Sequence, residues 1–256
     1  MYVSIDLGGT TTRVAAAESL IRPSFSRLQF ENAHVFEQDF AELQSLVAQF
    51  GKIAGIGIGV AGDVGDDKQS INAATNLHEY EAKPIVSLLS AKFQCPVFLE
   101  NDGVTAAYGE YYFGGGRLRE FELIIWGSGI GGAAVQNTGQ GVVISKLNWF
   151  TNFESWEKDC AGKVIEQVYS KSPADFSESE WASVMLKFQE HLLEFIKQNK
   201  PATIIFGGGI SIKQSKYLQI VLESVIRSTS TNLFISRLGE DAGIYGGFGM
   251  LASKLN

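Results

Sequence analysis

Three glycine-rich stretches of this chain have the residue types that bind phosphate groups. They are DLGGTTTR at residues 6–13, WGSGIGG at residues 126–132 and FGGGIS at residues 206–211. Backbone N–H groups in a glycine turn can surround a phosphate closely because no side chain stands in the way. The threonines of the first stretch add hydroxyl donors. Asp6 before them can face the Mg²⁺ that accompanies a nucleotide, since Mg²⁺ prefers one or two carboxylates together with phosphate and water.

Each stretch on its own could equally be a hairpin corner. None is a Walker A loop, because no Gly-Lys-Ser/Thr is present. Three such strand ends in one chain are better explained as two phosphate-binding turns and a wall that faces an adenosine.

The sequence ENDG at residues 100–103 is the other candidate for chemistry. A strand is expected to end and a helix to begin here, which places the Asp102 carboxylate at the mouth of an α/β sheet. Asn101 beside it offers a donor and an acceptor to a sugar hydroxyl. The alternative is that Asp102 only caps the helix that begins near Gly103, a contribution of about 1 kcal/mol.

The elements that position these residues alternate between strands and helices, which predicts an α/β protein. Strands are expected within residues 3–6, 10–20, 52–65, 96–102, 121–135 and 202–211, and helices within 83–93, 103–115, 154–197 and 240–255. The long helical region is interrupted near residues 171–180, where Ser177 and Glu180 predict a capping box. The hairpin pattern IDLGGTTTRVA is echoed by IIWGSGIGGAAV, which predicts two related lobes that share a hinge.

The composition argues against several classes of protein. The 256 residues are 45% hydrophobic and 19% charged, as in globular proteins. A formal net charge of −7 and the lack of a Lys/Arg cluster argue against a nucleic-acid partner. No apolar run approaches the roughly 20 residues that cross a bilayer and no signal peptide is indicated, so we expect a cytoplasmic protein without a membrane partner. Cys95 and Cys160 lie far apart, so no structural zinc site is expected.

A set of motifs, taken in order, resembles the ROK family of bacterial sugar kinases and their repressor relatives. The motifs are DLGGTTTR, GIGVAG, NLHEYE, ENDGVTAAYGE, WGSGIGG, FGGGIS and EDAGIYGG, and they cover nearly the whole chain. The resemblance implies the actin-like, hexokinase-like ATPase fold, in which two RNase H-like lobes hold nucleotide and sugar in the cleft between them. We expect a small N-terminal lobe of residues 1–103 with 238–256 and a larger C-terminal lobe of residues 104–237.

The resemblance also implies which residues form the site. The matching nucleotide-binding positions are Asp6, Gly8, Gly9, Thr10, Thr11, Gly127, Ser128, Gly129, Gly207, Gly208 and Gly209. The sugar-contacting positions are Asn76, Asn101, Asp102 and Glu157, with Asp102 as the catalytic base. ATP and Mg²⁺ are the implied cofactors. Asp6 is expected to contact the Mg²⁺ ion that is bound to the ATP phosphates.

The chain departs from the family between residues 136 and 165. The family's Glu-x-Gly-His segment and zinc-binding cysteine cluster are missing, and only SWEKDCAG resembles the end of that cluster. By this resemblance Glu157 matches a sugar-binding glutamate of the family; the alternative is an ordinary exposed helix charge. Cys160 is then a small buried hydrophobe. His78 is a candidate to replace part of the contact made by the missing histidine.

Four aromatic residues gather in this altered region, and they are Trp149, Phe150, Phe153 and Trp156. Aromatic rings can stack on the C–H face of a sugar. The interpretation that we favour is that they fill the core.

These features predict an ATP-dependent hexose kinase, similar to glucokinases, that phosphorylates a primary hydroxyl. Two alternatives stay open. One is a catalytically impaired sugar-sensing or interaction protein on the same fold, and the other is a kinase for an amino sugar such as N-acetylmannosamine or for a non-sugar hydroxyl. The expected partners are a small-molecule sugar and a nucleotide. Because related kinases are often dimers, a homodimer is a further expectation.

Overall fold

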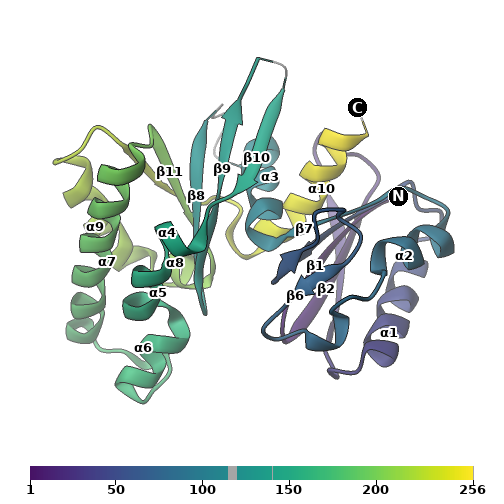
Figure 1. Cartoon of the computed structure of the whole chain (residues 1–256), viewed down its shortest axis with the longest axis horizontal. Helices are drawn as coiled ribbons and strands as arrows, with labels where there is room; N and C mark the ends of the chain where they lie inside the picture. Colours follow the sequence, from purple (N-terminus) through teal and green to yellow (C-terminus); the bar gives the residue numbers. More distant parts are fainter. Residues whose placement is uncertain (115–119, 140, 256) are drawn as a thin grey trace. The chain divides into compact units, whose positions relative to one another are not determined.

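The chain forms two compact units. Figure 1 shows its computed structural model, which describes residues 1–114, 120–139 and 141–255. Contacts within the chain define unit 1 as Met1–Arg117 with Asp241–Asn256, and unit 2 as Leu118–Glu240. The sequence placed residues 104–113 in the second lobe. The contacts assign them to unit 1, because the helix that they form packs against the C-terminal helix.

Unit 1 contains a five-stranded sheet in the order β3-β2-β1-β4-β7. Its strands are β1 (Tyr2–Leu7), β2 (Thr11–Ala17), β3 (Phe25–Glu31), β4 (Gly55–Val60) and β7 (Val97–Asn101). β1 forms the predicted hairpin with β2 and runs parallel to β4, which in turn runs parallel to β7. Leu7, Val60 and Asn101 lie in one row of this register. The ends of β1 and β7 therefore bring Asp6 and Asn101 to the same edge of the sheet.

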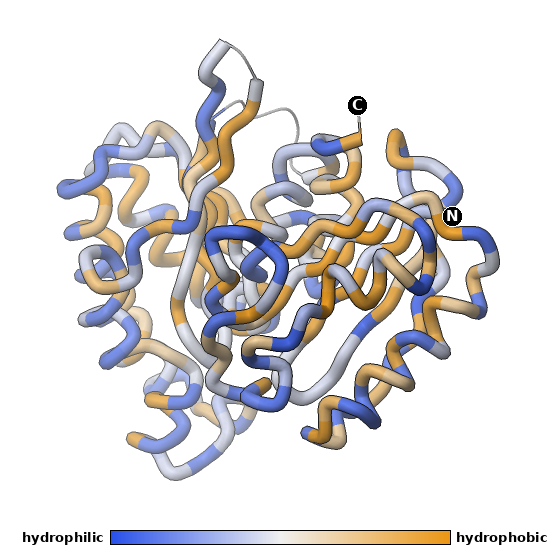
Figure 2. Tube along the Cα trace, turned by 45° about the vertical axis from the view of Figure 1, so that its right-hand side comes forward, coloured by the Kyte–Doolittle hydropathy of each residue, from blue (hydrophilic) through white to orange (hydrophobic). Residues whose placement is uncertain are grey.

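Helices cover both faces of this sheet. Val3, Ile5 and Leu7 of β1 pack in one core with α1 (Phe36–Ala48) and α2 (Ile85–Phe93). Ser4 points the other way and contacts the backbone of α10 (Ala242–Lys254). Figure 2 shows the hydrophobic residues that follow the strands between these layers. Helices α2 and α10 were predicted from the sequence, whereas α1 was not. A short hairpin of β5 (Asp63–Val64) and β6 (Ile71–Ala73) is followed by η1 (His78–Tyr80).

Small residues bring α3 (Asp102–Phe113) and α10 into backbone contact. A Cβ atom added to Gly109 on α3 would lie 2.8 Å from the amide nitrogen of Gly246 on α10. A Cβ atom on Gly247 would lie 2.9 Å from the carbonyl oxygen of Gly57 on β4. Glycine is needed at these positions because any side chain would push α10 away from α3 and from β4. This packing fixes the start of α3, where Asp102 lies.

Unit 2 repeats the same strand order, β10-β9-β8-β11-β12. Its strands are β8 (Phe121–Trp126), β9 (Ile130–Asn137), β10 (Val142–Lys146), β11 (Thr203–Gly207) and β12 (Asn232–Ile235). β8 forms an antiparallel hairpin with β9 and runs parallel to β11, as β1 does with β2 and β4. The repeated hairpin pattern in the sequence therefore corresponds to two units of the same sheet topology.

The helices of unit 2 build an aromatic core against this sheet. They are α4 (Trp149–Asn152), α5 (Glu154–Cys160), α6 (Gly162–Tyr169), η2 (Pro173–Asp175), α7 (Glu178–Asn199), α8 (Gly209–Lys213) and α9 (Ser215–Ile226). The predicted capping box of Ser177 and Glu180 opens α7. Phe153, Trp156 and Cys160 are fully buried, so the core interpretation is confirmed for them. Phe150 is 75% exposed.

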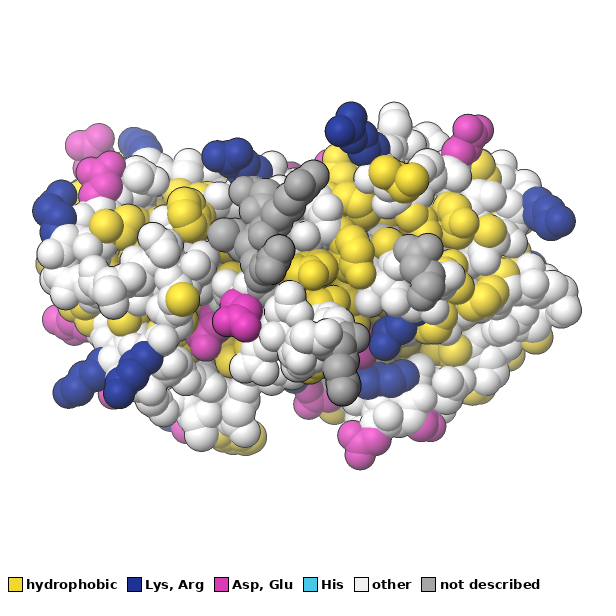
Figure 3. Space-filling view, turned by 90° about the horizontal axis from the view of Figure 1, so that it is seen from above, with side chains coloured by type: hydrophobic (Ala, Val, Ile, Leu, Met, Phe, Trp, Pro, Cys, Tyr) yellow, Lys and Arg dark blue, Asp and Glu magenta, His cyan; other side chains and the backbone are white. Residues whose placement is uncertain are grey.

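The surface carries charges of both signs. On the face shown in Figure 3, the basic and acidic side chains of the described residues are scattered in small groups. Among the helices that the structure describes, none is long and apolar enough to cross a membrane.

Candidate active site

The first glycine turn joins β1 to β2 and begins beside Asp6. Burial raises the pKa of the Asp6 carboxyl, and the charge of Asp241 adds to this shift. The guanidinium of Arg13, whose Nη1 lies 3.4 Å from Asp6 Oδ2, opposes it. The Asp6 carboxylate and the threonine hydroxyls after Gly9 are hard oxygen donors, the type that Mg²⁺ takes together with phosphate and water. The residue types at this turn therefore fit the predicted Mg²⁺ position.

Asn32 donates hydrogen bonds to backbone carbonyl oxygens of this turn. Its Nδ2 donates to Gly8 O at 2.7 Å, its backbone N–H donates to Thr10 O at 2.8 Å, and its Oδ1 accepts from Thr12 Oγ1 at 2.7 Å. Sequence reasoning missed Asn32, because it lies 24 residues from Gly8 in a stretch without any phosphate-binding pattern. Carbonyl oxygens repel phosphate, so a side chain that binds them helps to keep them directed away from a bound anion.

The structure brings Asn76 against this first turn. A Cβ atom added to Gly9 would lie 2.5 Å from the Cβ of Asn76, so only glycine fits there. A predicted sugar-contacting residue and a predicted phosphate-binding residue are thus neighbours within unit 1. His78 lies two residues further on, is 72% exposed on its side chain, and contacts Glu81 through Nδ1 at 3.0 Å.

At the start of α3 the N-cap is Asn101 and not Asp102. Asn101 Oδ1 accepts from the N–H of Gly103 at 3.0 Å, and its Nδ2 donates to Gly62 O at 2.9 Å. The cap position is thus one residue earlier than the alternative placed it, and both Asn101 and Asp102 accept from the N–H of Gly103. Asp102 is the first helical residue, half-buried, and its Oδ1 accepts from the N–H of Gly103 at 2.8 Å. The positive end of the helix dipole favours an ionised carboxylate at this position.

The second glycine turn, Gly127–Gly129, is held by the first amides of α6. The N–H of Gly162 donates to Gly127 O at 2.9 Å, and the N–H of Lys163 donates to Ser128 O at 3.0 Å. The first N–H groups of a helix have no partner within the helix, so the turn provides one. A Cβ atom on Gly162 would lie 2.6 Å from Gly127 O, which requires glycine at this contact.

A cavity of about 350 Å³ joins this turn to the end of β11. Gly127, Ser128 and Gly209 line it together with residues of α6 and α8. Gly208 has a φ of +88°, and a Cβ atom on it would lie 2.5 Å from Trp126 O. Gly208 thus caps α8 and turns the chain, so that Gly209 faces the cavity after Gly207 ends the strand. Two of the glycine stretches singled out in the sequence therefore meet at one cavity within unit 2.

Glu157 lies next to the second turn. The alternative that it is an ordinary exposed charge on a helix is wrong. Its side chain is 15% exposed, and its carboxylate lies 3.6 Å from the position of a Cβ atom on Gly129. Oε1 contacts Lys163 Nζ at 2.8 Å, and Oε2 accepts from Trp149 Nε1 at 2.7 Å. Burial raises the pKa of Glu157, but the bonds from Lys163 and Trp149 outweigh it and leave the pKa below its usual value.

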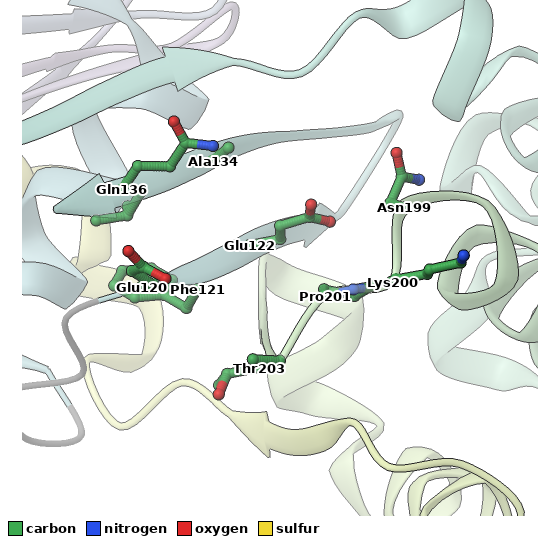
Figure 4. Close-up of a pocket in the computed structure, with 11 residues that line it drawn as sticks. Glu120, Phe121, Glu122, Ala134, Gln136, Asn199, Lys200, Pro201 and Thr203 are labelled. Carbon is green, nitrogen blue, oxygen red and sulfur yellow. The ribbon is translucent and has the colours of Figure 1, made fainter. Parts of the chain in front are cut away.

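A second cavity of unit 2, of about 280 Å³, lies at the other end of the same strands (Figure 4). Glu122 of β8 lines it, with Gln136 of β9 and Thr203 of β11 nearby. Burial raises the pKa of Glu122 to about 7, and its Oε2 has no hydrogen-bond partner among the described residues. The predicted nucleotide-binding turns are at the opposite ends of β8 and β11, so this cavity is separate from them.

The repeated sheet topology, with a glycine turn in the leading hairpin of each unit, is that of the actin-like, hexokinase-like ATPases. Solved structures share this fold. The ROK family glucokinase of Streptomyces griseus, solved with glucose and AMPPNP, has a TM-score of 0.77 at 18% identity, covering 97% of this chain and 98% of that one. The ROK hexokinase of Thermus thermophilus has a TM-score of 0.77 at 21% identity, covering 100% and 99%.

Residues 2–141 match the ROK family, and the chain belongs to this family. Over 85 residues it is 36% identical to the glucokinase of Streptomyces coelicolor, a match that covers 33% of this chain and 26% of that protein. The matched segment thus spans about a quarter of the length of this curated relative.

Proposed function

We propose that this protein is an ATP-dependent sugar kinase that phosphorylates a primary hydroxyl of a hexose or hexose derivative. The observation that carries the proposal is the arrangement in unit 2, where Lys163 lines a cavity with Gly127, Ser128 and Gly209 and also contacts the mostly buried carboxylate of Glu157. Backbone amides of the kind that bind phosphate thus lie close to a hydrogen-bond acceptor for hydroxyls. The complex of the Streptomyces griseus relative with glucose and AMPPNP supports this assignment.

The nucleotide has a proposed set of contacts in each unit. The turn at Gly8, Gly9, Thr10 and Thr11 in unit 1 and the amides of Ser128 and Gly129 in unit 2 donate hydrogen bonds to phosphate oxygens. The N–H of Gly127 donates to Gly129 O at 3.0 Å and holds the second turn in shape. The cavity lined by Gly209 takes the adenosine. Asp6 would hold the Mg²⁺ ion that accompanies the nucleotide phosphates, and this cation would supply positive charge next to the transferred phosphoryl group.

Asp102 acts as the general base in this proposal. Its carboxylate accepts the proton of the sugar hydroxyl while the hydroxyl oxygen forms a bond to the γ-phosphorus and the bond to the β-phosphate oxygen breaks. The products are the sugar phosphate and ADP. General-base catalysis of this kind contributes typically about 10²–10⁴-fold to the rate. Asn76 and Glu157 are the proposed contacts to the other sugar hydroxyls, and Asn101 fixes the start of α3.

The acceptor is proposed by class only. A hexose with a free 6-hydroxyl is the first choice, and an amino sugar such as N-acetylmannosamine is the second. The family's Gly-His segment is missing from residues 136–165, so the hydroxyls that it contacts elsewhere must find other partners here.

One observation favours a second candidate function, a sugar-sensing protein with impaired catalysis. Asn101, a predicted sugar contact, already spends one of its two N–H donors and one of its two oxygen lone pairs within unit 1. Together with the missing Gly-His segment, this reduces the hydrogen-bonding capacity left to orient an acceptor. A sensor needs affinity for a sugar but does not need a base.

The test is ADP release in a coupled assay with Mg·ATP over a panel of hexoses and amino sugars. We expect turnover on at least one sugar in the wild type and a loss of at least about 10²-fold in Asp102→Asn. Asp66→Asn is the matched control, because Asp66 is exposed in the loop after β5. Sugar binding without turnover would instead support the sensor, and full activity of Asp102→Asn would refute the assigned base.

A further inference from the structure

Lys163 occupies the junction between the second glycine turn and Glu157. Its backbone N–H donates to Ser128 O at 3.0 Å, so the start of α6 is fixed against the turn. Its ammonium lies 2.8 Å from Glu157 Oε1. The same residue lines the cavity that contains Gly127, Ser128 and Gly209. One side chain thus lies between the proposed sugar-binding carboxylate and the proposed phosphate-binding turn.

The surroundings of Glu157 show what Lys163 does for it. The carboxylate is mostly buried, and the groups that contact it are the Lys163 ammonium on α6, the Trp149 indole on α4 and the Ile130 amide on β9. Among the described residues, Lys163 is the charged member of this set. A buried carboxylate without a cation tends to take up a proton, and it then loses its value as an acceptor of hydroxyl hydrogen bonds.

Each carboxylate oxygen has two lone pairs, so the contact from Lys163 leaves one on Oε1 for a hydroxyl, whereas Trp149 and the Ile130 amide use both on Oε2. The contacts from Lys163 and Trp149 hold opposite oxygens, which also fixes the plane of the carboxylate. The Lys163 side chain is 57% exposed, so part of its charge remains available to an anion in the cavity.

We propose that Lys163 is a positioning residue for the sugar and, at the same time, a cation for the nucleotide phosphates. It keeps Glu157 ionised and oriented toward the sugar hydroxyls, and its ammonium attracts the phosphates bound at Gly127–Gly129. This inference rests on the proposed kinase function. It assigns to one lysine the electrostatic link between the two substrates.

Lys213 provides a matched comparison within the same cavity. It also lines the cavity and also pairs with a glutamate, since its ammonium lies 3.2 Å from Glu240. Both of these side chains are more than half exposed, so the pair is a solvated surface contact with little energetic weight. Removal of Lys213 takes a positive charge from the cavity without changing the surroundings of Glu157.

The experiment compares Lys163→Met, Lys163→Arg and Lys213→Met with the wild type. For Lys163→Met we expect the KM for the sugar to rise about tenfold or more and the KM for ATP about threefold to tenfold, with a smaller change in kcat. The acidic limb of the pH profile of kcat/KM for the sugar should move to higher pH, because the Glu157 carboxyl loses its cation. Lys163→Arg should restore most of the sugar affinity. Lys213→Met should change only the KM for ATP.

Two further measurements separate this inference from the proposed function. Titration of the Glu157 ¹³C-carboxyl signal by NMR and calorimetric binding of AMPPNP need no turnover. A wild type that is inactive on every sugar refutes the proposed function. In that case a raised titration midpoint for Glu157 and weaker AMPPNP binding in Lys163→Met still support the link through Lys163. Unchanged sugar KM and unchanged Glu157 titration in Lys163→Met would overturn it, as would identical behaviour of Lys163→Met and Lys213→Met.

Discussion

Glu122→Gln is expected to stabilise the protein at alkaline pH and to have a much smaller effect at acidic pH. Glu122 lies on the central strand β8, opposite Ala134 of β9 and beside Ile204 of β11. Burial raises the pKa of its carboxyl to about 7, and Oε2 lacks a hydrogen-bond partner among the described residues. Glutamine keeps the shape of the side chain but does not ionise.

The magnitude follows from the pKa in the folded and the unfolded protein. A carboxyl with a pKa of about 7 when folded and 4.5 when unfolded destabilises the fold by at most about 3 kcal/mol, at 1.36 kcal/mol for each pKa unit. The side chain is only half-buried and solvent screens its charge, so we expect about 1–2 kcal/mol. Because the folded-state pKa is raised, this penalty is absent below pH 4.5, grows toward pH 7 and is constant above it.

The assay is thermal unfolding at pH 8.5 and pH 5.5. We expect Glu122→Gln to raise Tm by about 2–6 °C at pH 8.5 and by less than half as much at pH 5.5. Glu120→Gln is the control, since Glu120 lines the same cavity but is exposed. An equal gain in Tm at both pH values would refute the reasoning, because the stabilisation would then be independent of ionisation.

Two further substitutions, each with a control variant, test the proposed site through activity. Gly9→Ala places a methyl group 2.5 Å from the Cβ of Asn76, so we expect turnover to fall by about 10²-fold through displacement of the turn, whereas Gly131→Ala meets open space and should keep its activity. Equal rates for these two variants would contradict the role of the first turn. Trp149→Phe removes the 2.7 Å bond to Glu157 Oε2, so the KM for the sugar should rise about fivefold to tenfold while the KM for ATP stays constant. Phe150→Ala is its control because Phe150 is 75% exposed, and a sugar KM that is the same in both variants would show that the indole does not position Glu157.

Much of the fold could be read from the sequence because its signals are local. A glycine turn between two alternating apolar segments specifies a hairpin by itself, and both hairpins formed where expected. The capping box of Ser177 and Glu180 needs only residues three apart, and it opens α7 as predicted. The buried strand β4 follows from its Gly-Ile alternation. The family resemblance came from the same local motifs.

The partners of the site residues came only from the tertiary structure. Asn32 reaches Gly8 across 24 residues, and Gly9 meets Asn76 because the loop after β6 packs against the first turn. Trp149 and Lys163 converge on Glu157 because α4 and α6 both pack against α5, which carries Glu157. Such contacts depend on how elements pack, and no periodicity or spacing in the sequence encodes them.

The boundary between the two units was also decided by the tertiary structure. The sequence predicts a helix after Asn101 but cannot say which sheet it covers. Contact with α10 decides this, since Gly109 and Gly246 allow the two backbones to touch. The sequence by itself thus determined the fold class, the glycine turns and the position of Asp102 at a strand end, since each depends on neighbouring residues. The burial that shifts the pKa of Glu122 was decided by packing between distant residues, and the cation beside Glu157 by how α6 packs against α5.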